Sequence, residues 1–345
     1  MDNPIPNIEM LDLIVSPCFC VKNGEICQRN RAASILPLGD RLTPLLFTGQ
    51  EEYAAFSGGS LYLTLSLGGT LFGATVERKG EFDFFLLEYP GENGELRVLS
   101  LAARVLRQPL SGILSASQAL QPIADAEPAM DSINRSAAQL LRIIGNMSSA
   151  ASASFHPEMV EITGVFREIF EKSAVLLSGA GVTLHYQGME GTLYCLADTQ
   201  ELERAILNLV SNAIKFNDKG ELSCSLTRQG HMLRLCVQDN GSGISDEIRS
   251  SVFLRYLRQP AIEDERFGLG LGLVLVRSCA SHHGGTVLID HPVQGGTRVT
   301  MTMAIRQDGG SALRSPLLRI DYAGERDHSL IELSEILPKE YYKEL

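Results

Sequence analysis

No stretch of this sequence is apolar over the length that a membrane span requires. A transmembrane helix needs about 20 consecutive, predominantly apolar residues, and no run of the 345 residues approaches that length. The first 14 residues, MDNPIPNIEMLDLI, carry acids and prolines where a signal peptide would carry lysines. We therefore expect a cytoplasmic protein without a membrane span.

Long basic runs are missing as well, and the formal net charge is −11. This charge argues against nucleic acid or an anionic membrane as the main partner. The seven cysteines are an odd number at scattered positions and match no zinc-binding pattern. Cys224 and Cys236 lie in alternating apolar runs and are expected to be core thiols. A redox or metal sensor built from Cys18, Cys20 and Cys27 stays open as an alternative for the input.

Hydrophobic periodicity divides the chain into four parts, which predicts a multidomain α+β protein. Residues 1–92 alternate strand-like runs with short helices and turns and predict a small α+β domain. Residues 96–150 switch to a helical period. Residues 155–307 mix helices with strands and predict a second α/β domain. Residues 308–345 form a tail of mixed composition.

Two helices with regular apolar spacing are predicted within residues 96–150. The first helix carries its seam at Leu96, Leu99, Ala103, Leu106, Leu110, Ile113, Ser117 and Leu120, and the second at Met130, Ile133, Ala137, Leu140, Ile144 and Met147. A short turn with proline joins the helices into an αα-hairpin. One hairpin cannot cover both seams, whereas two copies packed as a four-helix bundle can, so the pattern predicts a homodimer.

Polar side chains on one predicted helix, 199–216, are suited to a metal and phosphates. Asn208 and Asn212 are four residues apart and share a helical face, and Lys215 lies on the same side. The amide oxygen of asparagine is a hard, neutral ligand that suits Mg²⁺. We expect the opposite, apolar face of this helix to be buried.

Three glycine-containing motifs follow that helix. In DNGSGI, Asp239 ends a predicted strand, so its carboxylate can accept a hydrogen bond from an exocyclic amine, while Gly241 and Gly243 let backbone approach a flat ring. GLGLGL, with glycines at 268, 270 and 272, opens a helix and exposes amides to a phosphate chain. GGT, ending at Thr297, gives one more tight backbone approach beside the last strand.

Together, these four motifs resemble the ATP-binding domain of sensor histidine kinases, which belongs to the Bergerat-fold ATPases. NLVSNAIKF is similar to the N box, DNGSGI to the G1 box, GLGLGL to the G2 box and GGT to the last glycine motif. VFLRYLR, between DNGSGI and GLGLGL, is similar to the F box. The resemblance implies an α/β sandwich that binds ATP and Mg²⁺, with Asn208 and Asn212 serving the metal and the phosphates and Asn212 as the Mg²⁺ ligand. It also implies that Asp239 holds adenine and that Lys215 and Arg258 lie near the phosphates.

The preceding parts resemble the same family. The hairpin is similar to the family's dimerisation and phosphotransfer hairpin, whose first helix carries His-Glu-x-x-x-Pro-Leu, and Pro109-Leu110 match the end of that motif. Residues 1–92 resemble a PAS sensor domain. A response-regulator receiver domain is the partner that the resemblance implies.

The acceptor histidine of that motif is absent. Its position is Arg104, the glutamate position is Val105, and residues 97–150 contain no histidine. A guanidinium stays protonated and has no nucleophilic lone pair comparable to that of imidazole. The sequence therefore predicts an ATP-binding, sensor-kinase-like signalling protein that is degenerate in autophosphorylation, so whether it is an enzyme stays open.

Two other functions stay open. Arg104 and Arg107 could grip acidic groups of a partner, and Gln108 could position a water, as in a response-regulator phosphatase or an ATP-gated scaffold. An ATP hydrolase or a Ser/Thr kinase of the same superfold is the other alternative. It is weakened because such relatives usually carry a glutamate base where this chain has Asn208.

Overall fold

The computed structural model describes most of the chain outside a few segments. The described residues are 11–12, 14–43, 46–89, 102–103, 106–107, 110–111, 113–114, 117, 127–151, 154–215, 217, 220–244, 271–293, 295–307 and 327–343. The candidate site residues Arg104, Gln108, Arg258, Gly268 and Gly270 lie outside them, as do Val105, Pro109 and the seam positions Leu96, Leu99 and Leu120.

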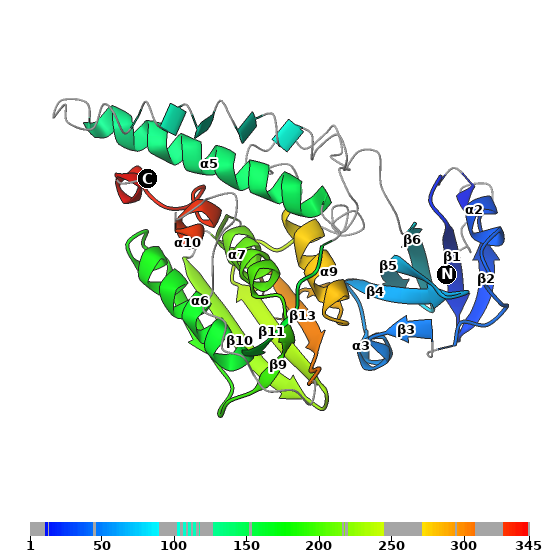
Figure 1. The fold of residues 1–345 in the computed structure, drawn as a ribbon. Coiled ribbons are helices and arrows are strands. Elements are labelled where there is room, and N and C mark those ends of the chain that lie inside the picture. Colours follow the sequence, from blue (N-terminus) through cyan, green and yellow to red (C-terminus); the bar gives the residue numbers. More distant parts are fainter. Residues whose placement is uncertain are drawn as a thin grey trace.

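The N-terminal part is an antiparallel sheet with its own core (Figure 1). Its elements are β1 (Cys18–Lys22), β2 (Glu25–Arg29), α2 (Arg31–Ser34), β3 (Phe47–Thr48), α3 (Gln50–Ala55), β4 (Ser60–Leu67), β5 (Thr70–Lys79) and β6 (Phe82–Glu88). Asn23 and Gly24, both at positive φ, make the tight turn between β1 and β2. Residues 60–89 alternate apolar and polar side chains and are interrupted at Gly68-Gly69 and at Lys79-Gly80, which predicts three strands. These strands are β4, β5 and β6, so that prediction is confirmed.

In the second α/β part, the helices α6, α7 and α9 lie on one face of a sheet (Figure 1). Its elements are β7 (Glu158–Glu161), α6 (Ile162–Ser178), β8 (Thr183–Gln187), β9 (Tyr194–Ala197), α7 (Thr199–Lys215), β10 (Glu221–Gln229), β11 (Met232–Asp239), α9 (Gly272–His282), β12 (Val287–Asp290) and β13 (Arg298–Ala304). The order of the five main strands is β12-β13-β11-β10-β8, and β7 pairs with β9 separately. The apolar face of α7 is buried, as its spacing predicts.

The two sheets join edge to edge. β4 pairs antiparallel with β12, with Tyr62 opposite Val287, so that one continuous sheet runs through both parts. Arg277 on α9 reinforces this junction: it lies 2.5 Å from a Glu88 carboxylate oxygen and over the ring of Tyr62. The hydroxyls of Thr64 and Ser281 are 2.9 Å apart across the same boundary.

The second hairpin helix is α5 (Glu127–Ala151), and the described residues of the first one are helical. Alternate seam positions are buried: Ala103, Leu110 and Ser117 on the first helix and Met130, Ala137 and Ile144 on α5. The hydroxyl of Ser117 lies 2.5 Å from Oδ1 of Asn134, which ties the two helices together. Among the described intervening seam positions, Leu106, Ile113, Ile133 and Leu140 are exposed, whereas Met147 near the end of α5 is buried.

The tail differs most from what its composition suggests. Residues 327–343, called here the C-terminal segment, form α10 (His328–Glu332) and a 3₁₀ turn, η3 (Lys339–Tyr342). Asp327 caps α10 by accepting from the Ser329 amide. The segment lies between α5 and the helices α6 and α7 (Figure 1). No helix among the described residues combines the length and apolarity needed to cross a membrane.

Candidate functional site

Helix α7 presents two asparagines at the centre of the candidate site. Asp198 caps it, accepting from the Glu201 amide at 3.1 Å. Asn208 is only 1% exposed, whereas Asn212 and Lys215 are half-buried. Asn208 is therefore not on a solvated face, because α5 and the C-terminal segment cover it.

The helix-opening glycine of GLGLGL lies directly against these asparagines. A Cβ atom on Gly272 would stand 3.1 Å from Oδ1 of Asn208 and 3.3 Å from Nδ2 of Asn212. A side chain there would crowd both amides. The structure thus brings the first and third motifs together, as the sequence predicts.

Asp239 ends β11 and is 4% exposed. One carboxylate oxygen, Oδ1, accepts from the amides of Gly241 at 2.8 Å and Thr297 at 3.0 Å. Burial raises the pKa of the Asp239 carboxyl, and those two amides, with His291 nearby, oppose the rise. The carboxylate is consequently held in a fixed orientation.

The GGT turn needs glycine to approach this strand end. Gly296 has φ +83°, and a Cβ there would collide with the carbonyl oxygen of Asp239. Gly243 has φ +80°, and a Cβ there would stand 3.0 Å from the His291 ring. The second and fourth motifs therefore form one unit, with Thr297 and Gly241 both donating to Asp239.

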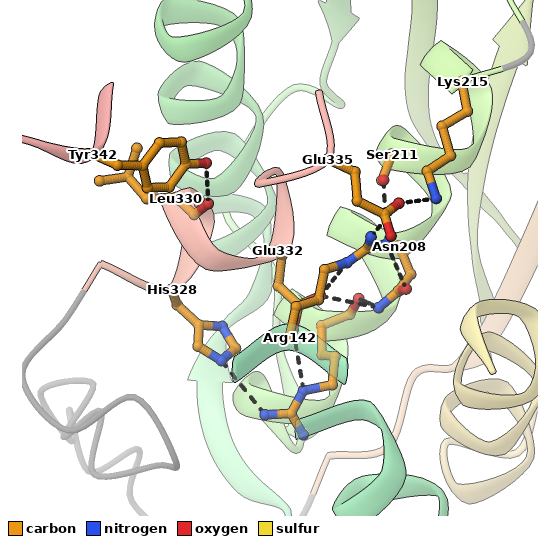
Figure 2. Close-up of polar contacts among 10 residues, drawn as sticks. Arg142, Asn208, Ser211, Lys215, His328, Leu330, Glu332, Glu335 and Tyr342 are labelled. Carbon is orange, nitrogen blue, oxygen red and sulfur yellow. Dashed lines mark hydrogen bonds and ion pairs between the residues drawn. The ribbon is translucent and has the colours of Figure 1, made fainter. Parts of the chain in front are cut away.

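Four further residues, which sequence reasoning missed, surround Asn208: Arg142, Ser211, Glu332 and Glu335. Arg142 on α5 places Nη2 3.5 Å from Oδ1 of Asn208 and 3.2 Å from Oγ of Ser211. Its Nη1 lies 2.6 Å from Glu335 and its Nε 3.4 Å from Glu332 (Figure 2). An arginine inside the apolar run LLRIIGN was the available signal.

Among the amides, Asn212 is the better candidate for holding Mg²⁺. The Asn208 oxygen faces the Arg142 guanidinium, and a cation would be repelled there. Asn212 is partly accessible and offers an amide oxygen, a ligand type that Mg²⁺ accepts. The donor set therefore fits a metal at Asn212 more readily than at Asn208.

A different group of described residues could hold a metal by spacing alone: Glu201, Cys279 and His283, whose ligand atoms lie within 4.8 Å of one another. His283 is already satisfied, however. Its Nε2 accepts from the Asp198 amide at 3.0 Å, and its Nδ1 lies 2.8 Å from the Cys279 carbonyl oxygen. Burial lowers the pKa of His283. We interpret this group as a hydrogen-bonded anchor between α7 and α9.

Comparison with known proteins finds similar chains for the second α/β part and for regions beyond it. Residues 197–307 match the family described as histidine kinase-, DNA gyrase B-, and HSP90-like ATPase. Histidine protein kinase DivJ of Caulobacter vibrioides is 33% identical over 256 residues, which is 69% of this chain and 42% of DivJ. Adaptive-response sensory kinase SasA of a Synechococcus strain is 28% identical over 274 residues, covering 74% of this chain and 71% of SasA.

Among solved structures, full-length ShkA in complex with AMPPNP shares the fold. The TM-score is 0.51 at 22% identity, over 63% of this chain and 47% of that one. The chain thus spans less than half the length of DivJ and of the ShkA chain.

Proposed function

Because this chain belongs to the sensor histidine kinase family, we propose that it is a nucleotide-binding signalling protein that has lost the ability to phosphorylate itself. Its α/β domain, residues 155–307, binds Mg-ATP. Its hairpin, residues 96–150, makes a homodimer and offers its outer face to a response-regulator receiver domain. Residues 1–92 are a PAS-like input domain.

One observation supports the nucleotide site: motifs that lie far apart in the sequence pack together in two pairs. Gly272 lies against Asn208 and Asn212, and Asp239 is fixed by the amides of Gly241 and Thr297. In this proposal Asp239 accepts from the adenine amine, and Asn212 holds Mg²⁺. The bound ion would neutralise phosphate charge beside Lys215.

The remaining predicted nucleotide contacts lie outside the described residues. Arg258 is proposed near the phosphates, and Gly268 and Gly270 would leave backbone amides open to them. Arg104 and Gln108 are also outside. The loss of autophosphorylation rests on chemistry alone, because the arginine at position 104 has no nucleophilic nitrogen at neutral pH.

The nucleotide site predicts a loss of affinity on removing one charge. Asp239→Asn should weaken Mg-ATP binding by roughly 1.5–3 kcal/mol, because a charge-assisted hydrogen bond is lost. Asn212→Ala should weaken binding of Mg-ATP more than binding of ATP without Mg²⁺. Isothermal titration calorimetry measures both affinities.

Asp40→Asn is the matched control, since Asp40 is fully exposed in the N-terminal part. Its affinity for Mg-ATP should equal that of the wild type. Unchanged affinity in both Asp239→Asn and Asn212→Ala would remove this site assignment.

The homodimer proposal is supported by the seam positions that the hairpin leaves uncovered. Leu106, Ile113, Ile133 and Leu140, called here the exposed stripe, are each 40–47% exposed. Three of them, with Leu110, Ser132, Ser136 and Ala137, line an open apolar groove. A second hairpin that packs its own stripe into this groove would bury all four side chains.

Leu106→Glu combined with Ile113→Glu should therefore dissociate the dimer without unfolding the monomer. The monomer already exposes both side chains to water, whereas a bundle would bury two unpaired carboxylates per chain at a cost of several kcal/mol each. Light scattering at micromolar concentration reads the mass. Ile35→Glu with Val175→Glu, two exposed apolar sites outside the stripe, is the control. A monomeric wild type would contradict the bundle.

A further inference from the structure

The C-terminal segment brings carboxylates to the candidate nucleotide site. Glu335 forms ion pairs with Lys215 of α7 and, at 2.6 Å, with Arg142 of α5 (Figure 2). Glu332 lies 3.4 Å from Arg142 and 3.5 Å from Nδ2 of Asn208. A phosphate chain that approached Lys215 would meet an anion already in place.

Apolar burial fixes the segment in this position. Ile331, Leu333, Leu337 and Tyr342 are fully buried in the same core as α5, α6 and α7. Asn134 of α5 donates to the Tyr342 carbonyl at 2.8 Å, and Arg135 and Gln139 donate to the Ser334 carbonyl. The carboxylates are therefore held beside α7 at a permanently high local concentration.

The two glutamates differ in their access to water. The Glu332 side chain is completely buried, whereas 27% of the Glu335 side chain is exposed. Glu335 can consequently swing toward solvent while the apolar side chains keep the backbone in place. Glu332 has no such path and serves as a fixed partner of Arg142 and Arg204.

Lys215 and Arg142, the two cationic side chains paired with Glu335, are stabilised by a neighbouring anion. Burial, with the adjacent Arg142 charge, lowers the pKa of Lys215 to about 8. Two neighbouring positive groups in a half-buried site repel each other, and a carboxylate or a phosphate relieves that repulsion.

We propose that Glu335 is a built-in competitor of the nucleotide phosphates, and that ATP binding exchanges its carboxylate for phosphate at Lys215 and Arg142. This inference rests on the proposed Mg-ATP site. Since Arg142 belongs to the hairpin and Glu335 to the chain terminus, the exchange moves the hairpin's arginine from a protein partner to the nucleotide. Glu335 thereby sets the affinity and couples occupancy of the site to the hairpin.

Glu335→Gln tests the exchange in the full-length protein, because it removes the charge and keeps the size. Mg-ATP should bind about tenfold more tightly to this variant, equivalent to roughly 1.4 kcal/mol. Adenosine, which has no phosphates, should bind both proteins equally. If Glu335 had only a structural role, Glu335→Gln would change the affinities for Mg-ATP and for adenosine by the same factor. Glu340→Gln, at an exposed glutamate of the same segment, is the control and should match the wild type.

The outcomes separate the two ideas. If Asp239→Asn weakens Mg-ATP binding but Glu335→Gln leaves it unchanged, Glu335 is not a competitor of the phosphates. The nucleotide site itself would still be supported by that result. An equal gain for adenosine also overturns the competitor role of Glu335. Absence of Mg-ATP binding from every variant overturns the proposed function and this inference together.

Discussion

Arg142→Met should lower the free energy of unfolding by about 3 kcal/mol or more, because it leaves a fully buried carboxylate without its main partner. The Arg142 side chain is 6% exposed and the Glu332 side chain 0%. After the substitution Glu332 keeps Arg204 at 3.6 Å and the Asn208 amide, which limits the loss. Urea denaturation followed by circular dichroism measures the change.

Two comparison variants sharpen that experiment. Arg41→Met breaks a surface pair with Glu25, in which both side chains are more than half exposed, and should change stability by less than about 1 kcal/mol. Arg142→Met combined with Glu332→Met should recover stability relative to the single variant, because the unpaired carboxylate disappears. Equal stability of Arg142→Met and Arg41→Met would show that the buried ion pair of Arg142 with Glu332 does not stabilise the position of the C-terminal segment.

The second large effect expected is a gain of autophosphorylation. Wild-type protein should bind ATP without labelling its own hairpin, whereas Arg104→His with Val105→Glu should acquire an acid-labile, base-stable phosphoryl group. Histidine supplies the nucleophile and glutamate its base, and proximity to bound ATP can lower the barrier by several kcal/mol. Incubation with γ-labelled ATP measures the label. Both positions lie outside the described residues, and neighbouring Ala103, a seam position, is buried.

Arg104→Lys with Val105→Glu is the matched control, since lysine keeps the charge without an imidazole. Label on the wild-type hairpin would mean that the acceptor was identified wrongly. An unlabelled double variant that still binds ATP would mean that the catalytic geometry has decayed along with the acceptor, leaving a nucleotide-gated scaffold.

Local patterns predicted the elements that depend on local chemistry. Alternation of apolar residues predicted β4, β5 and β6, and the Asn-Gly pair at 23–24 is the type of sequence that favours the observed tight turn between β1 and β2. The GGT motif predicted the close backbone approach at Gly296, which requires a missing side chain. For GLGLGL the prediction was exposed amides, not the approach of Gly272 to Asn208 and Asn212. The seam spacing predicted the hairpin helices, and alternate seam positions are buried within one chain.

Contacts between segments that are distant in the chain could not be predicted from local sequence patterns. Arg142 and Glu332 are 190 positions apart in sequence, and nothing local to either residue identifies its partner. The spacing of Ile331, Leu333 and Leu337 is too short to indicate which surface buries them. For the same reason, the β4–β12 junction could not be predicted: both strands read as ordinary strands, and only folding determines which edges meet.

That junction has a mechanical consequence. Three consecutive residue pairs, from Ser60–Ile289 to Tyr62–Val287, form a backbone ladder between the N-terminal sheet and β12. The chain leaving β12 turns through Gly296 and Thr297, the residues that meet Asp239. A strain that bends or slides β4 must carry β12 with it or break the ladder. A displacement of the N-terminal part would therefore reach the turn at Gly296 and Thr297, and with it Asp239, through backbone hydrogen bonds, in addition to the side-chain contacts that α9 makes at the same boundary.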